Sequence, residues 1–144
     1  MLYQLLSITF MLFSFSFLSA QNWNKHYSEN GIEISSQEDL CVKKSEGIEK
    51  NYLFLKIKNT NSEAVKLTYQ IQKWYDGKCI NCGQNNLENG FYTLELNPGE
   101  TKTGTCEDYR DRKLAVFSSM PNQSQVRKLT QVQIIPISLN GEKL

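Results

Sequence analysis

The four cysteines of this chain, Cys41, Cys79, Cys82 and Cys106, are the residues whose type and spacing could carry chemistry. Cys79 and Cys82 form a C-x-x-C pair, the spacing of thioredoxin-like proteins that exchange disulfides. That reaction needs a thiolate of lowered pKa, usually at the N-terminus of a helix that follows a strand. The four thiols could instead hold a zinc ion, although only one half-site has the usual close spacing. In an oxidising compartment, the same residues most often form two disulfides.

Residues 1–20, MLYQLLSITFMLFSFSFLSA, indicate that compartment, because they contain no charged side chain. An apolar run from Leu5 to Leu18, followed by Ser19 and Ala20, is typical of a secretory signal peptide. The run is too short to span a bilayer comfortably. An uncleaved N-terminal anchor is the alternative, since no Lys or Arg precedes the run. The residue directly after the cleavage point is Gln21 and not a cysteine, so we expect an exported, non-lipidated protein, periplasmic or extracellular, with no transmembrane segment in its mature part.

We therefore expect two disulfides, and three pairings are possible. We favour those that join Cys79 and Cys82 separately to Cys41 and Cys106, because they close long loops. The third pairing joins Cys79 to Cys82 and Cys41 to Cys106. The residues after Cys82 are a poor helix start and no βαβ pattern surrounds them, which argues against thioredoxin-like chemistry.

The other residue types that carry chemistry form no catalytic or metal-binding pattern. His26 is the sole histidine, and it lies in residues 21–30, which we predict to be a flexible N-terminal arm. Glu107, Asp108 and Asp111 are interleaved with basic residues, which predicts a solvated, self-compensating charged turn rather than a calcium site. The glycines lack phosphate-loop spacing. We expect no metal, no cofactor and no enzymatic activity.

The charge balance excludes one class of partner. Lys and Arg number 16 and Asp and Glu 15, for a net charge of +1, which gives no long-range attraction to nucleic acid. Removal of residues 1–20 leaves a chain of single-domain size. We expect residues 31–144 to form that domain.

The elements that must position these residues are strands, because apolar and polar residues alternate along the chain. The Pro-Gly pair in Asn97–Glu100 predicts a tight turn, and Pro136 predicts a bulge or a sheet edge. The predicted strands are Gly31–Lys44, Asn51–Lys58, Ala64–Tyr75, Phe91–Leu96, Thr101–Cys106, Lys113–Met120 and Leu129–Leu139.

About seven short strands with almost no helix predict an all-β fold, an antiparallel β-sandwich. Their spacing, the long third strand and the Pro-Gly turn resemble immunoglobulin-like sandwiches and, more loosely, small uncharacterised exported proteins of bacteria built on that fold. The resemblance covers most of Gly31–Leu139 and implies no activity. If consecutive strands alternate in direction, all four cysteines fall at one pole of the sandwich.

Three aromatic residues suggest a binding surface. Tyr52, Phe54 and Trp74 have the parity opposite to the apolar positions of their strands, and they lie beside lysines and glutamines. Exposed rings could stack on sugars or anchor a protein. The alternative is that a bulge turns Trp74 inward, or that the Asp76–Gly90 loop covers the rings.

The favoured hypothesis is an exported, non-enzymatic domain that binds a protein or glycan of the cell envelope. One alternative is a structural accessory domain stabilised by disulfides, without a small ligand. The other is a thiol-dependent redox protein that uses Cys79 and Cys82.

Overall fold

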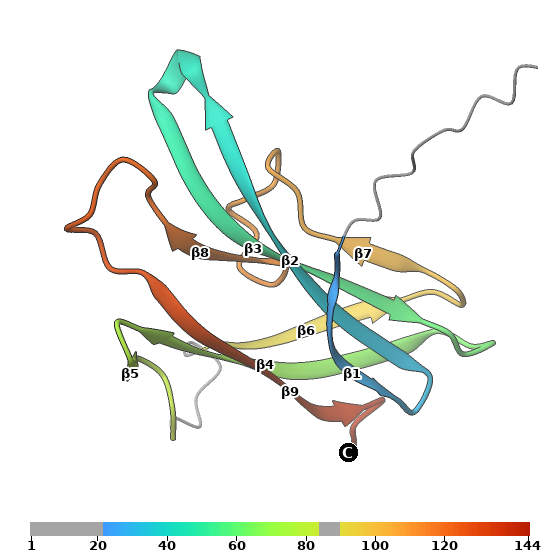
Figure 1. The fold of residues 1–144 in the computed structure, drawn as a ribbon. Coiled ribbons are helices and arrows are strands. Elements are labelled where there is room, and N and C mark those ends of the chain that lie inside the picture. The colour runs from blue at the N-terminus through green and yellow to red at the C-terminus, as the bar shows by residue number, and fades with distance from the viewer. Residues whose placement is uncertain (1–21, 84–89) are drawn as a thin grey trace, which may run out of the picture.

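Ten strands form two antiparallel sheets in the computed structural model, which describes residues 22–83 and 90–144 (Figure 1). The first sheet contains β1 (Asn24–Glu29), β2 (Ile32–Lys43), β3 (Ile48–Asn59), β7 (Thr101–Thr103) and β8 (Ala115–Ser119). The second sheet contains β4 (Val65–Tyr75), β5 (Lys78–Cys79), β6 (Phe91–Leu96), β9 (Leu129–Leu139) and β10 (Glu142–Lys143). The described part is all-β, with one short 3-10 turn, η1 (Lys44–Glu46), and it contains no helix that could span a bilayer. The predicted signal peptide lies outside the described residues.

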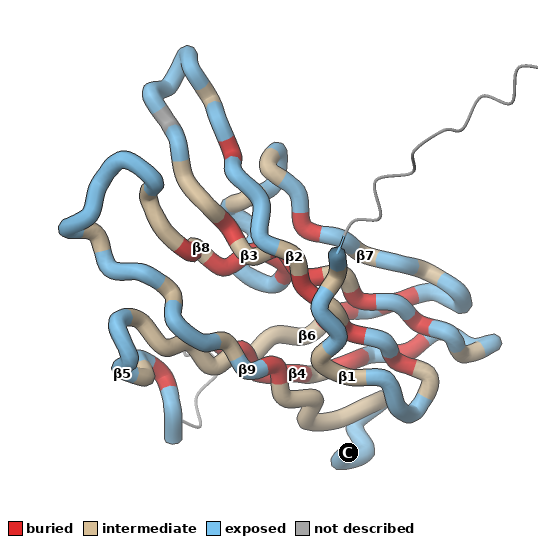
Figure 2. Tube along the Cα trace, in the orientation of Figure 1, coloured by how far each residue is buried: buried red, intermediate tan, exposed pale blue. Residues whose placement is uncertain are grey.

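The two sheets pack face to face on one apolar core. The predicted alternation along β4 is confirmed, since Val65, Leu67, Tyr69 and Ile71 are buried while Lys66 is exposed. Facing residues of β2, β3, β6 and β9, with Leu114 and Val116 at β8, complete this core, and Figure 2 shows the buried positions along these strands.

A buried amide closes the core at one end. Asn59, with none of its surface exposed, ends β3, and its Nδ2 donates to the carbonyls of Glu63 at 2.8 Å, Asn97 at 3.0 Å and Leu96 at 3.2 Å. These bonds join the end of the first sheet to the end of β6 in the second. The sheets lie close together at this end and diverge toward the other (Figure 1).

Each of the seven predicted segments contains a strand, and three further strands were not predicted. The missed strands β1, β5 and β10 are each joined to a neighbour by a two-residue turn. These turns are Asn30-Gly31, Asp76-Gly77 and Asn140-Gly141, and all six residues have positive φ. Asn-Gly and Asp-Gly favour type I′ turns, whose twist matches that of a hairpin. The sequence therefore contained a signal for all three hairpins.

The prediction of a flexible arm is wrong for Asn24–Glu29, because the Asn30-Gly31 turn folds these residues back onto β2 as β1. A bulge between Lys25 and Tyr27 leaves His26 out of the register. The imidazole Nε2 of His26 lies 2.7 Å from the hydroxyl of Ser36, which is buried. His26 is thus half-buried rather than solvated.

Two local predictions are confirmed. The N–H of Glu100 bonds to the carbonyl of Asn97 at 3.0 Å, and Gly99 has the positive φ that this turn requires. The β4–β9 register shifts next to the pair of Tyr69 with Pro136, where a proline cannot donate to the ladder.

The favoured disulfide pairing is wrong, and the third pairing is observed. Cys41 bonds to Cys106, and Cys79 bonds to Cys82, with Cα atoms 5.4 Å and 5.7 Å apart. The physical reason is that Cys41 and Cys106 pack together on the outer face of the first sheet, whereas Cys79 lies on β5 in the second sheet. No cysteine among the described residues is free, so none is left as a zinc ligand.

Both disulfides lie at the same end of the molecule, as the strand directions predict. Cys41 pairs with Lys50 near the start of β3, and Cys79 pairs with Trp74 near the end of β4. The disulfides thus lie at the end of the molecule where the sheets diverge, and Asn59 lies at the other end.

The two disulfides should stabilise the fold unequally, because Cys41 and Cys106 are 65 positions apart and Cys79 and Cys82 only three. From loop-closure entropy, we expect the double change Cys41→Ala/Cys106→Ala to lower the free energy of unfolding by about 4 kcal/mol. The matched change Cys79→Ala/Cys82→Ala should cost about 2 kcal/mol. Urea unfolding of the oxidised proteins measures both. Equal losses would contradict this ranking.

His26 should make stability depend on pH, because burial lowers the pKa of its imidazole. Above the pKa of the unfolded chain both states are neutral and the full stability is present. As the pH falls from about 8 to about 5, the unfolded chain takes up the proton first and stability is lost. His26→Gln keeps a polar partner for Ser36 and should flatten this part of the profile. Unfolding at several pH values tests it, and identical profiles would exclude a contribution from His26.

Candidate functional site

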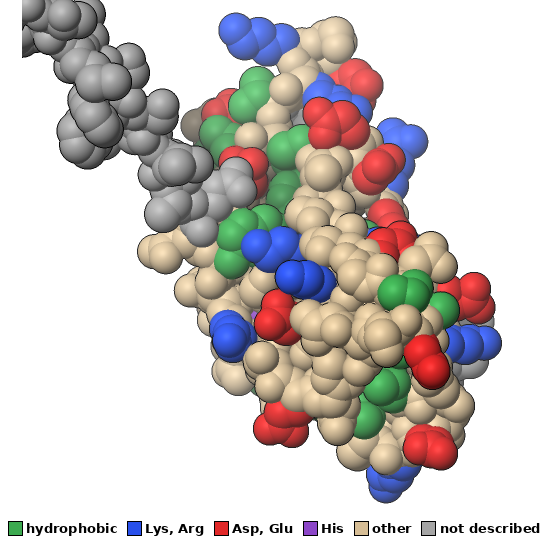
Figure 3. Space-filling model, turned by 90° about the vertical axis from the view of Figure 1, so that its right-hand side faces the viewer, with side chains coloured by type: hydrophobic (Ala, Val, Ile, Leu, Met, Phe, Trp, Pro, Cys, Tyr) green, Lys and Arg blue, Asp and Glu red, His purple; other side chains and the backbone are tan. Residues whose placement is uncertain are grey.

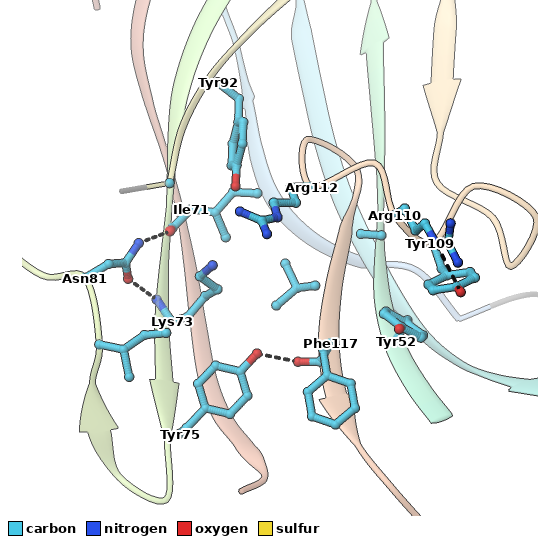
Figure 4. Close-up of a pocket in the computed structure, with 14 residues that line it drawn as sticks. Tyr52, Ile71, Lys73, Tyr75, Asn81, Tyr92, Tyr109, Arg110, Arg112 and Phe117 are labelled. Carbon is cyan, nitrogen blue, oxygen red and sulfur yellow. Dashed lines mark hydrogen bonds between the residues drawn. The ribbon is translucent and has the colours of Figure 1, made fainter. Parts of the chain in front are cut away.

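An open cleft of about 550 Å³ lies between the diverging sheets at the disulfide end (Figure 4). One wall comes from β4 and the loop after β5. The other comes from the start of β3, β8 and residues 105–113, which we call the arginine loop. Four tyrosines and three cations line the cleft: Tyr52, Tyr75, Tyr92, Tyr109, Lys73, Arg110 and Arg112. None of the described lining residues is acidic.

The second sheet places a lysine in this cleft by strand parity. Ile71, Lys73 and Tyr75 continue the inward series of β4 and line the cleft. Lys73 is therefore a cation at a position that is apolar elsewhere along the strand. Burial and the charge of Arg112 lower the pKa of its amine.

Two tyrosine hydroxyl groups on β4 hold the opposite wall. Tyr69 Oη donates to the carbonyl of Lys113, and Tyr75 Oη donates to the carbonyl of Phe117, both at 2.6 Å. The two bonds fix residues 113–117 across the gap between the sheets. Burial raises the pKa of both phenols, which keeps them protonated as donors.

The C-x-x-C segment completes the edge of β4. Asn81, between Cys79 and Cys82, is buried, and its Nδ2 donates to the carbonyl of Ile71 at 2.7 Å. Its Oδ1 accepts from the N–H of Lys73 at 2.9 Å. β6 pairs with β4 up to Gln70 and β5 from Trp74 onward, so the side chain of Asn81 bonds to the stretch of β4 between them. The small loop closed by the disulfide positions this amide.

Leu55 of β3 closes the base of the arginine loop. The N–H of Leu55 donates to the carbonyl of Leu114, and its carbonyl accepts from the N–H of Gly104, both at 2.9 Å. A Cβ at position 104 would collide with the carbonyl of Leu114, so only glycine fits this approach. Cys106 then ties the loop to β2 through its disulfide with Cys41.

The predicted charged turn is solvated, since its acidic and basic side chains are exposed, but these charges form no close ion pair among the described residues. Among residues 22–83 and 90–144, no carboxylate lies within 4.0 Å of Lys73, Arg110 or Arg112. The ion pair found in these residues joins Lys102 to Glu100 at 3.9 Å, outside the cleft. Asp111 is engaged instead by the backbone, with its Oδ1 accepting from the N–H of Lys113 at 3.0 Å. No group of three metal-ligating side chains is found in the same residues.

The predicted aromatic surface is wrong for Tyr52 and Phe54. Both have the outward parity that was expected, but they are only 7% and 4% exposed. The disulfide Cys41–Cys106 and the ring of Tyr109 cover them; the centroids of Tyr52 and Tyr109 are 5.2 Å apart. The covering loop is the arginine loop rather than Asp76–Gly90. Tyr52 still contributes an edge to the cleft.

Trp74 does not join the other two rings. It is half-buried on β4, in the second sheet, and its parity puts it on the face opposite to Tyr75. The three predicted residues therefore lie on two sheets and form no common surface.

Sequence reasoning missed Lys73 and Arg112. Lys73 carried a signal, because it interrupts the inward series between Ile71 and Tyr75. Arg112 carried none, since its place in the cleft depends on how the arginine loop folds.

Comparisons of this chain with protein-family models, with curated proteins and with solved structures find no match. The cleft is therefore interpreted from its own geometry.

Replacement of the cleft lysine should stabilise the fold. Lys73→Met removes a half-buried charge that faces Arg112 and keeps the length of the side chain. After solvent screening, we expect a gain on the order of 0.5 kcal/mol in the free energy of unfolding. The control Lys66→Met, at an exposed position of the same strand, should give no gain. Loss of stability in Lys73→Met would show that the amine is satisfied in the folded state.

Proposed function

We propose that this chain is an exported, non-enzymatic β-sandwich of the immunoglobulin-like type that binds a protein or glycan of the cell envelope through the cleft. The observation that carries the proposal is the composition of the cleft. Tyrosine rings and cations converge from both sheets, and no carboxylate of the described residues lies within 4.0 Å of Lys73, Arg110 or Arg112. Tyrosine and arginine are the residue types enriched where proteins bind ligands and partners.

The strand order supports the immunoglobulin-like assignment. In the first sheet β3 lies between β2 and β8, and in the second β4 and β10 flank β9. The chain crosses between the sheets after β3, after β6 and after β8. With β2, β3 and β8 as strands A, B and E, and β4, β9 and β10 as C, F and G, this resembles the A-B-E and G-F-C orders of an immunoglobulin sandwich. It differs in that β7 pairs with β3 rather than with β8, and in the additional strand β1.

Two features support export. Residues 1–20 have the composition of a signal peptide. The described cysteines are all in disulfides, which persist in oxidising compartments such as the periplasm or the extracellular space.

The position of the sole histidine supports a non-enzymatic role. His26 contacts Ser36, the arrangement that a nucleophilic serine requires, but this serine is only 2% exposed on the first sheet. Neither residue lines the cleft. A substrate in the cleft would not reach this pair.

Retention of the exported protein on immobilised envelope material tests the proposal. The arginines Arg110 and Arg112 are exposed, so their replacement should leave the fold intact. We expect Arg110→Glu/Arg112→Glu to reduce retention at least about tenfold, since about 1.4 kcal/mol is lost for each factor of ten. Lys58→Glu/Lys66→Glu, at the opposite end, is the matched control and should bind normally. Equal binding by both double variants would move the site away from the cleft.

A second candidate function is thiol–disulfide exchange at Cys79 and Cys82, because the two residues pair with each other and Cys82 is exposed. Reduction of insulin disulfides by the protein, lost in Cys79→Ser, would favour this function. No retention of any variant on envelope material leaves the structural accessory role.

A further inference from the structure

The cleft has a charge imbalance that a bound anion would remove. Lys73 is half-buried beside Arg112, and burial and this neighbouring positive charge lower the pKa of the lysine. Figure 4 shows both side chains directed into the same space. An anion placed between the half-buried amine of Lys73 and the exposed guanidinium of Arg112 would stabilise both charges.

The imbalance is local. On the face of the molecule shown in Figure 3, basic and acidic side chains are interspersed, in keeping with the net charge of +1. In the cleft only one sign is present among the described lining residues. The carboxylate of Asp111 acts on Tyr92 but does not line the cleft, so the charged side chains that a ligand would meet there are cations, which favour an anionic ligand.

The two arginines of the cleft differ in availability. Arg110 is engaged with Tyr109, since its Nε donates to the phenol oxygen at 3.3 Å and its Cζ lies 5.5 Å from the ring centroid. In residues 22–83 and 90–144, the guanidinium of Arg112 has no hydrogen-bond or ion-pair partner. Its planar donors match a carboxylate or sulfate group, which they can hold with two parallel bonds.

The backbone argues against an extended peptide as the ligand. A peptide usually joins a β-protein by adding a strand to a free edge. Here Ile71 bonds to Gly90 and Asn81, with N···O distances of 2.7 Å for both. Lys73 accepts from the N–H of Ile80 at 3.0 Å and donates to Asn81. The edge of β4 in the cleft is therefore occupied. On β8, which lines the facing wall and pairs only with β3 among the described strands, the carbonyl of Phe117 already accepts from Tyr75 Oη. Recognition in the cleft thus falls mainly to side chains.

The aromatic residues favour a carbohydrate. On one wall Tyr109 covers the buried Tyr52, so the ring of Tyr109 is the one offered there, and Tyr75 and Tyr92 lie on the opposite wall (Figure 4). Tyrosine offers an apolar face with a polar edge, which suits a sugar ring with its C–H face and its hydroxyl rim. A cleft of about 550 Å³ is also within the range of sites for small organic ligands.

We infer that the cleft binds an acidic oligosaccharide, with its carboxylate or sulfate group held by Lys73 and Arg112 and its sugar rings against the tyrosines. This inference rests on the proposed function, which makes the cleft the binding site. It adds the chemical class of the ligand and the two residues that select it.

Titration of the full exported protein with four defined probes tests the inference. The probes are tetragalacturonate, a sulfated chondroitin tetrasaccharide, neutral cellotetraose and a hexaglutamate peptide, and binding is followed by calorimetry. We expect at least one acidic sugar to bind at least about tenfold more tightly than cellotetraose and hexaglutamate. The better of the two acidic sugars identifies the anion as carboxylate or sulfate.

Variants assign that binding to the cleft. Lys73→Met and Arg112→Gln should each weaken the acidic sugar about tenfold or more, whereas Lys58→Gln and Lys66→Gln should not. Urea unfolding of Lys73→Met, which is expected to be at least as stable as the natural chain, separates a loss of affinity from a loss of folding.

Three outcomes would overturn the inference. These are equal binding of cellotetraose, tighter binding of hexaglutamate, or equal loss in the cleft and control variants. If none of the probes binds but retention on envelope material still depends on the arginines, the ligand class is wrong and the proposed function stands. If that retention is also absent, both fail.

Discussion

Two tyrosine hydroxyl groups set the geometry on which the rest of this structure depends. Tyr69 and Tyr75 project from the same face of β4 and bond to the carbonyls of Lys113 and Phe117 across the gap between the sheets. At the opposite end, the same task falls to Asn59, whose side chain is much shorter. The long tyrosine side chains at one end and the short asparagine side chain at the other hold the two sheets at an angle to each other. The cleft is the open side of that angle, and it exists because the tyrosines keep the sheets apart.

The two disulfides act on the cleft more than on the core. Cys41–Cys106 ties the arginine loop to β2, and Cys79–Cys82 holds Asn81 against β4. Neither bond joins one sheet to the other, and the apolar core between the sheets contains neither. The two disulfides thus hold segments that lie where the pairing between strands is interrupted and where few apolar side chains are in contact. The core, by contrast, is held by alternating apolar side chains, which bury themselves without such help.

Most of the fold was predictable from the sequence, and the site was not. Strands such as β4 were found because inward and outward positions alternate in the sequence itself. The hairpin at Asn30-Gly31 was also readable, through a turn type that the dipeptide strongly favours. The burial of Tyr52 could not be predicted from the sequence. It depends on the arginine loop, which follows some fifty residues later, and on the pairing of Cys41 with Cys106. Parity gives the side of a sheet, but only the tertiary fold determines what covers it.

The ladders of both sheets are interrupted at matching places. Along one edge of β3, pairing passes from β7 to β8, and along one edge of β4 it passes from β6 to β5. A loop leaves each sheet at its interruption, and its base is pinned by backbone atoms of the central strand, as Leu55 pins Gly104 and Leu114. Loops anchored in this way can change in length and composition while the framework stays intact. The framework therefore tolerates variation in these two segments, because the strands that hold them keep their own pairing.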